Sequence, residues 1–153
     1  MTRYAQNTSV DSSRTKAEIE RTIMKYGANG FVSGWQGEQA TIMFDMSDRR
    51  VRFTLHLPDK KNFELSEAGR KRKPPALEQA WEQACRQAWR ALALVVKAKL
   101  EAVESGITTF DEEFLAHIVL PGTGGATVGD KILSEGGKFL GTGKLPPLLG
   151  GRS

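Results

Sequence analysis

The sequence is poor in the side chains that most often bind metals or form disulfides. Its 153 residues include one cysteine, Cys85, and two histidines, His56 and His117. A single cysteine excludes an intrachain disulfide and a multi-cysteine metal site. Two histidines far apart in the chain give little support to a histidine metal site. We therefore expect neither a metal ion nor any other cofactor.

The chain also lacks a long apolar segment. No run approaches the roughly 18 apolar residues of a membrane-spanning helix, and the polar N-terminal residues lack the apolar core of a secretory signal. Hydrophobic residues still make up 39% of the sequence, which is enough to form a folded core. These features predict one soluble, cytoplasmic α+β domain without a membrane partner.

A recognisable catalytic constellation is missing as well. Neither His56 nor His117 has a serine, cysteine or carboxylate at a spacing typical of catalysis. Cys85 falls within an apolar helical arc, so we expect a buried, unreactive thiol. The segment 141–144 (Gly-Thr-Gly-Lys) lacks the first glycine of a phosphate-binding loop, and the prolines at 146–147 prevent the helix that must follow such a loop. The sequence therefore favours binding over catalysis, and we expect no enzyme.

The hydrophobic pattern predicts a helix, an antiparallel meander and a second, long helix. Thr15 and Glu18 match a capping box, and Gly27 suits the end of that first helix. Strict alternation of apolar and polar residues then indicates strands, with Gly37-Glu38 suited to a two-residue hairpin turn. Pro74-Pro75 favours a helix that starts just after it. The expected elements are a helix over 14–26, three strands within 30–57 with a turn at 47–49, a helix over 76–105, and a short helix over 109–119 capped by Thr108 or Thr109.

The same pattern predicts how these elements pack. One face of the sheet should lie against both helices, because its strands alternate in period two. The domain should span 14–121, between an N-terminal arm (1–13) and a flexible tail (122–153), since ten glycines fall in the last 33 residues. The residues expected to face the helices include Ile42, Phe44, Val51, Phe53 and Leu55.

The apolar arc of the long helix predicts self-association. At ~100° per residue, its apolar side chains spread over more surface than a three-stranded sheet covers, so a second subunit or the helix at 109–119 must cover the rest. The segment Leu145–Leu149 is a further apolar element that suits docking on a neighbour. The arc comprises Leu77, Trp81, Ala84, Ala88, Leu92, Val95 and Ala102, widened by Cys85, Trp89, Val96 and Val103.

Positive charge is concentrated in the middle of the chain. Thirteen basic and five acidic residues lie between Arg49 and Lys99, although the net charge of the whole chain is only +4. Such a local excess is typical of surfaces that bind phosphates, and cations strung along one track suit a nucleic-acid backbone. Aromatic side chains near the track suit stacking on bases. The candidate stacking residues are Phe31, Trp35 and Phe63, although core packing is the favoured interpretation of Phe31 and Trp35. The predicted contacts are Arg50, Arg52, Lys60, Lys61, Arg70, Lys71, Arg72, Lys73, Arg86, Arg90 and Lys97.

Three resemblances bear on this expectation. The order helix, three-stranded meander, long helix is similar to that of double-stranded RNA-binding domains. A sheet packed on a long helix with a basic track between them also resembles the core of phage single-strand annealing proteins, which assemble into rings. The stretch from Trp81 to Leu94, with the later 146–149 (Pro-Pro-Leu-Leu), resembles small uncharacterised bacteriophage and prophage proteins. This last resemblance implies an intracellular protein of a mobile element.

Two functions follow as hypotheses. The first is a non-enzymatic nucleic-acid-binding protein of a phage or mobile element, with single-stranded DNA favoured, acting in recombination or replication. The second is a protein–protein interaction module, such as a phage-encoded inhibitor or adaptor, whose basic face meets an acidic partner surface. Charge alone does not distinguish DNA, RNA and an acidic protein.

Overall fold

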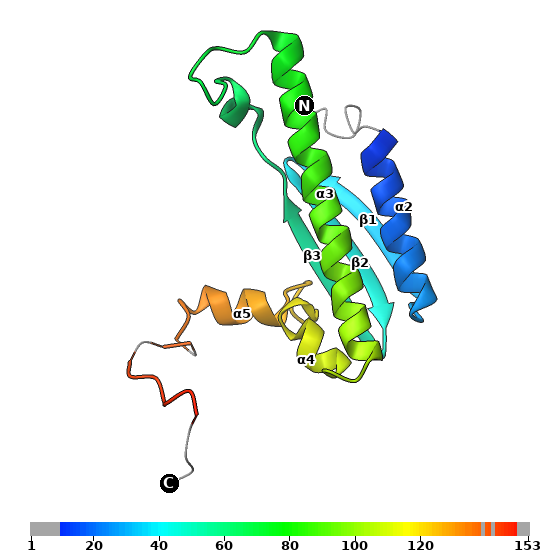
Figure 1. Ribbon diagram of the computed structural model, residues 1–153. Coiled ribbons are helices and arrows are strands. Elements are labelled where there is room, and N and C mark those ends of the chain that lie inside the picture. The colour runs from blue at the N-terminus through cyan, green and yellow to red at the C-terminus, as the bar shows by residue number, and fades with distance from the viewer. Residues whose placement is uncertain (1–9, 139, 142, 150–153) are drawn as a thin grey trace.

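In the computed structural model of this chain, residues 10–138, 140–141 and 143–149 are described. Within them, an antiparallel three-stranded sheet carries two helices on one face (Figure 1). The predicted α+β class and the predicted order of elements are confirmed. The elements are α2 (Val10–Lys25), β1 (Gly30–Gln36), β2 (Gln39–Met46), β3 (Arg49–His56), the 3-10 helix η1 (Lys60–Phe63), α3 (Pro74–Glu104), α4 (Phe110–Phe114), the 3-10 helix η2 (Leu115–His117) and α5 (Val128–Ser134).

The first helix starts earlier than its capping signature suggested. Thr15 lies inside α2 and is only 8% exposed, so it does not cap the helix. The expected arm therefore becomes helical from Val10 onward. The predicted end is confirmed: Gly27 has a φ of 103°, and the Ala28 N–H donates to the Ile23 carbonyl across it.

Both turns of the meander have two residues. Gly37 adopts a φ of 59° between β1 and β2, as a type II′ turn requires of its first residue. Between β2 and β3, Ser47 and Asp48 have φ values of 54° and 59°, which is the type I′ arrangement. Arg49, expected in the turn, is instead the first residue of β3 and pairs with Met46.

The buried stripe of α3 is rotated from the predicted one. Its buried side chains follow one another at intervals of three or four residues, as expected for one helix face. Val95, expected on the buried face, is 43% exposed, whereas Trp89, expected at its margin, is fully buried. The prediction gave small alanines the same weight as tryptophans, although the largest side chains determine the packing. The buried residues of α3 are Trp81, Cys85, Trp89, Leu92, Val96 and Leu100.

The wide apolar arc of α3 is mostly covered by its own chain. Ile19 and Ile23 of α2 belong to the same core and are at most 1% exposed. Phe114 of α4 is fully buried and meets the ring of Phe44 edge-on at 6.0 Å. The arc therefore gives no strong reason for self-association.

The C-terminal part folds back along the sheet. The helix expected over 109–119 is shorter and is divided into α4 and η2, which end at His117. Of the two expected caps, Thr109 caps α4, and its side chain accepts from the Glu112 N–H. The next residues run along the outer edge of β3, where the Val119 N–H donates to the Arg50 carbonyl at 2.8 Å.

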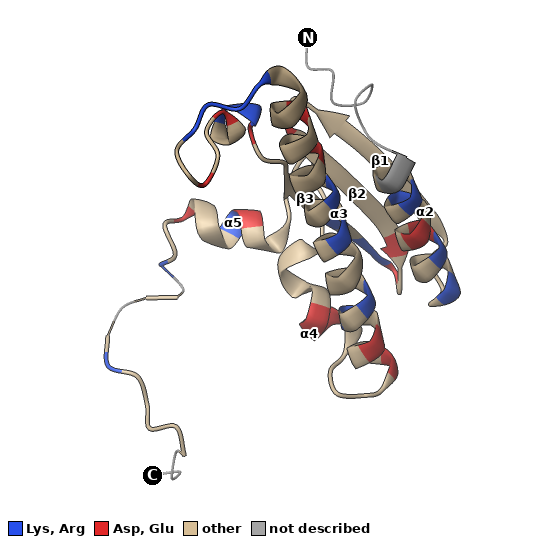
Figure 2. Cartoon of the chain, turned by 45° about the horizontal axis from the view of Figure 1, so that its top comes forward, with Lys and Arg blue, Asp and Glu red and all other residues tan. Residues whose placement is uncertain are grey.

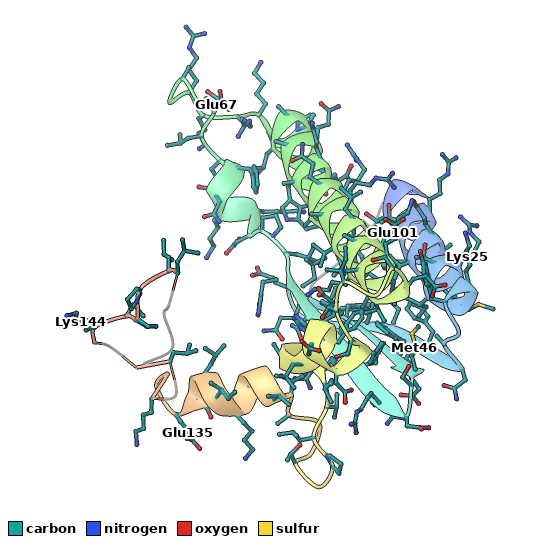
Figure 3. The ribbon with its side chains drawn as sticks, turned by 60° about the horizontal axis from the view of Figure 1, so that its bottom comes forward. Lys25, Met46, Glu67, Glu101, Glu135 and Lys144 are labelled. Carbon is teal, nitrogen blue, oxygen red and sulfur yellow. The ribbon has the colours of Figure 1, made fainter. Side chains whose placement is uncertain are left out.

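The expected tail contains an ordered element. Thr127 is 6% exposed and caps α5, and Val128 packs against the core. The compact part of the chain therefore continues beyond residue 121, and Figure 3 shows Glu135 at the end of α5 with Lys144 beyond it. Among the described helices, none is both long and apolar enough to cross a membrane.

Candidate nucleic-acid interface

The connector between β3 and α3 is folded rather than open. The Asp59 carboxylate accepts from the Lys61 N–H at 3.0 Å and so caps η1. The chain then turns back on itself, with the Ser66 N–H donating to the Arg70 carbonyl at 2.8 Å. We call residues 60–73 the basic hairpin. Glu67 marks its tip, at the opposite end of α3 from Glu101 (Figure 3).

Arg72 holds the basic hairpin closed. Its Nη1 donates to the carbonyl of Phe63 at 2.8 Å and to that of Leu65 at 2.9 Å. Its backbone N–H also donates to the Glu64 carbonyl. The guanidinium therefore has a structural task, although the sequence had suggested a phosphate contact.

Lys60 fastens the base of the basic hairpin to α3. Its Nζ lies 2.7 Å from a Glu78 carboxylate oxygen and 4.6 Å from the centre of the Trp81 ring. The Trp81 indole N–H in turn donates to the Pro58 carbonyl at 2.7 Å. Lys60 therefore also has a structural role, because its contacts attach the hairpin to α3.

Four cations of the basic hairpin remain available. Lys61, Arg70, Lys71 and Lys73 are all exposed, and they form no ion pair within the described residues. Figure 2 shows residues 70–73 as a continuous basic stretch leading into α3. Glu64 and Glu67 are the acidic residues of the hairpin, against six basic ones.

The start of α3 adds to this positive potential. Helix N-termini normally attract acidic side chains, because the helix dipole is positive there, but the first turn of α3 contains none. Pro74 and Pro75 occupy its first positions and lack N–H donors. The helix end therefore attracts anions mainly by its field, because two of its backbone N–H donors are absent. The sequence carried this signal: no acidic residue follows Lys73 until Glu78.

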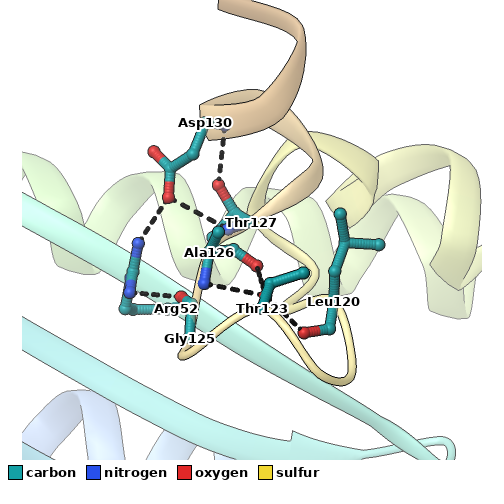
Figure 4. Close-up of polar contacts among 7 residues, drawn as sticks. All are labelled: Arg52, Leu120, Thr123, Gly125, Ala126, Thr127 and Asp130. Atoms are coloured by element: carbon teal, nitrogen blue, oxygen red, sulfur yellow. Dashed lines mark hydrogen bonds and ion pairs between the residues drawn. The ribbon is translucent and has the colours of Figure 1, made fainter. Parts of the chain in front are cut away.

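The strand arginines are already engaged by acidic side chains. Arg50 donates through Nε and Nη2 to both carboxylate oxygens of Asp45, at 2.8 and 2.9 Å. This bidentate bond lowers the pKa of Asp45. Arg52 reaches Asp130 at 2.6 Å and the Gly125 carbonyl (Figure 4). Neither guanidinium is free for a phosphate in this arrangement.

The predicted single track across strand, loop and helix is wrong. Val51 and Phe53 face the helices and are buried, so Arg50 and Arg52, which alternate with them, lie on the opposite face of the sheet. The basic residues of α3 lie on the helix-bearing face, and the sheet therefore separates the two sets.

The basic stripe of α3 is divided too. Arg90 bridges to Glu18 of α2 at 2.7 Å. Arg86 is half-buried in an open groove that Thr15 and Arg90 also line. Lys97 is exposed further along α3.

The three candidate stacking residues do not share a surface with the strand arginines. Phe31 lies opposite Phe44 and Trp35 opposite Ala40, so both are on the helix-covered face. Phe31 and Phe63 pack against the core. Trp35 is the most accessible of the three, at 45% exposure.

The titratable groups outside the hairpin have structural environments. Burial raises the pKa of the Cys85 thiol to about 11, so the thiol is protonated at neutral pH. His117 stacks on Phe53 at 4.1 Å, and burial, with Lys99 nearby, lowers its pKa. His56 Nδ1 lies 3.4 Å from the Gln39 amide nitrogen. In the described part of the chain, no three metal-ligating side chains cluster together.

Comparison with known proteins gives no relative from which a function can be transferred. No protein-family model, no curated protein and no solved structure matches this chain. The functional argument therefore depends on the geometry described above.

Proposed function

We propose that this chain is a non-enzymatic nucleic-acid-binding protein whose interface is the exposed part of the basic hairpin. The contacts we assign are Lys61, Arg70, Lys71 and Lys73, beside the positive end of α3. Charged, flexible side chains on a protruding loop suit contacts to phosphates, which carry no sequence information. Single-stranded DNA is the favoured ligand class, in line with the resemblance to annealing proteins.

One contrast supports the proposal most strongly. Elsewhere on the surface, four arginines pair with acidic residues: Arg49 with Asp111, Arg50 with Asp45, Arg52 with Asp130 and Arg90 with Glu18. The hairpin gathers cations without such partners among the described residues, where they repel one another and the helix dipole. An arrangement that costs folding free energy in this way is typical of a binding surface.

The biological setting rests on resemblance. The resemblance of the stretch from Trp81 to Leu94 to phage and prophage proteins implies the intracellular setting of a mobile element. In that setting we propose action in the cytoplasm on DNA exposed during recombination or replication. The basic hairpin would then supply affinity and leave base recognition to pairing between strands.

The salt dependence of binding tests the proposal. We would measure retention of single-stranded DNA, double-stranded DNA and single-stranded RNA oligonucleotides over a range of salt concentrations. Each phosphate contact on a single strand contributes a slope of about −0.7 to the log–log plot of affinity against salt. Replacing Lys61, Arg70, Lys71 and Lys73 together by Gln should therefore flatten the slope by up to about three units. Lys60 and Arg72 are retained because they hold the hairpin in place.

A control variant removes the same charge elsewhere. Replacing four exposed cations outside the hairpin by Gln changes the net charge equally but should leave most of the slope intact. If the salt dependence of binding flattens equally in both variants, the effect reflects net charge and the assigned interface is wrong. If the unmodified protein binds none of the three nucleic acids at low salt, the proposal fails in favour of an acidic protein partner. The control positions are Arg21, Lys25, Lys131 and Lys144.

A further inference from the structure

The outer edge of β1 is open in the described part of the chain. The sheet order is β1-β2-β3, so β1 has a strand neighbour on one side only. The opposite edge of the sheet is partly covered, since Val119 binds to Arg50 and Ile118 bridges to Val51. Natural edge strands are usually protected by charges, prolines or bulges. β1, with the sequence GFVSGWQ, contains neither a charge nor a proline, and its Val32 is 59% exposed.

The hydrogen-bond pattern identifies the backbone groups on that edge. The Leu57 N–H donates to the Glu38 carbonyl, so Gln39 and His56 form a non-hydrogen-bonded pair between β2 and β3. Odd-numbered residues of β2 therefore turn their backbone groups toward β1. Their partners in β1 are the even-numbered residues, and the N–H and C=O groups of Phe31 and Ser33 point outward.

We propose that β1 pairs in antiparallel fashion with β1 of a second copy of this chain, about a two-fold axis at Ser33. Residues whose backbone N–H and C=O groups point outward must pair with residues of the same kind in the other copy. A pairing of Ser33 with Ser33 satisfies this condition at the centre of the strand. Phe31 then lies opposite Trp35 of the other copy, and Val32 lies opposite Gly34.

The side chains of β1 fit this register. On the helix-covered face, Phe31 of each copy lies opposite Trp35 of the other, and these two pairs flank the central pair of Ser33 side chains. Such cross-strand aromatic pairs are favourable. On the other face, the exposed Val32 meets Gly34, a position where an added Cβ would find open space. The two strands carry no charge, so copies of β1 do not repel each other. The product is a continuous six-stranded sheet with both pairs of covering helices on one face.

The C-terminal segment of the same chain is a poorer occupant. Residues 145–149 are apolar and exposed, with Leu145 at 84% and Leu148 fully accessible. However, Pro146 and Pro147 lack the N–H groups that an added strand must supply. A second β1 supplies its full set. This inference is independent of the proposed nucleic-acid binding.

Measurement of the solution mass tests the pairing. The unmodified protein should have twice the mass of the 16.8 kDa chain by light scattering at high concentration. Ser33→Lys places two ammonium groups directly opposite each other across the axis and should shift the protein to a monomer. Thr54→Lys adds the same charge at an exposed position of β3 and should leave the dimer intact. A monomeric unmodified protein would overturn the proposal, as would a dimer that persists in the folded Ser33→Lys variant.

Cysteine cross-linking tests the register by forming a covalent dimer, and so does not depend on a variant that dissociates. In a Cys85→Ala background, Ser33→Cys places two Cα atoms about 5.5 Å apart across the axis, within disulfide range. Val32→Cys places its two copies diagonally, at roughly 7–8 Å, where a disulfide does not form readily. We expect a covalent dimer from Ser33→Cys under mild oxidation and little from Val32→Cys. Equal cross-linking of both variants, or of neither, would exclude this register.

Discussion

At the scale of single residues, burial determines the chemistry of Cys85. The side chain is 4% exposed within the stripe of α3 that faces the core. Burial disfavours the thiolate, which raises the pKa to about 11 from 9.0. A protonated, enclosed thiol is a poor nucleophile, in agreement with the expectation from its place in the apolar arc.

This burial predicts a pH dependence of stability. Below pH 9 the thiol is protonated in both the folded and the unfolded state, and its contribution to the free energy of unfolding is fully present. Between pH 9 and 11 the thiol ionises only in the unfolded chain, so this contribution is lost. The stability of the unmodified protein should therefore fall relative to that of Cys85→Ala by roughly 2 kcal/mol across this interval. Denaturant unfolding of both proteins over this pH range measures the difference. Parallel curves would show that the thiol ionises equally in both states.

At the scale of elements, the sequence predicted repeating patterns better than single positions. Alternation in β2 and β3 identified the strands and the buried face because a half-buried strand must alternate. The helix α3 was predicted within two residues at its start, since Pro74 and Pro75 restrict where a helix begins. The start of α2 was missed because Thr15, in a capping pattern, is buried inside the helix instead.

The candidate site was less predictable, for a physical reason. The sequence shows which residues are cationic, but not which of them meet an acid. The partner of Arg52, Asp130, lies 78 positions away, and the partner of Arg49, Asp111, lies 62 positions away. Such pairs depend on how the C-terminal segment docks, and no local pattern encodes that docking. The free cations were therefore distinguishable only in the folded chain.

The basic hairpin depends on Arg72, and this dependence predicts a local effect. Replacing Arg72 by Gln removes two hydrogen bonds to the carbonyls of Phe63 and Leu65. The free energy of opening the hairpin should fall by about 1 kcal/mol, which corresponds to roughly fivefold faster exchange of the Ser66 amide hydrogen. Lys71→Gln removes the same charge without these bonds and should change the exchange rate much less. Hydrogen-exchange NMR measures both variants, and equal effects would assign the opening to charge alone.

At the scale of the whole molecule, one polar cluster joins the C-terminal segment to the sheet. Arg52 of β3 donates to the Asp130 carboxylate, and that carboxylate also accepts from the Thr127 N–H at 2.9 Å (Figure 4). This backbone hydrogen bond, with a contribution from Arg52, lowers the pKa of Asp130. The same carboxylate therefore caps α5 and ties that helix to a strand far away in the sequence.

A double-mutant cycle separates these two tasks. Arg52→Gln should remove only the link to the strand, whereas Asp130→Asn should remove the link and also weaken the cap of α5, which typically costs about 1 kcal/mol. Because the Asp130 side chain is 53% exposed, the coupling between the two changes should be small. We expect about 0.5 kcal/mol, and less at high salt. The measurements are denaturant unfolding and exchange of the Lys131 amide, which donates to the Thr127 carbonyl inside α5.

The pH dependence of that coupling distinguishes an ion pair from simple packing. The pKa of Asp130 is lowered from 3.8, so the contribution of its carboxylate is complete above pH 3.8 and is lost as the pH falls through the lowered pKa. The coupling to Arg52 should therefore vanish in acid, while packing of Val128 against the core persists. A coupling that survives protonation of Asp130 would mean that the link between Arg52 and Asp130 does not depend on the charge of the carboxylate.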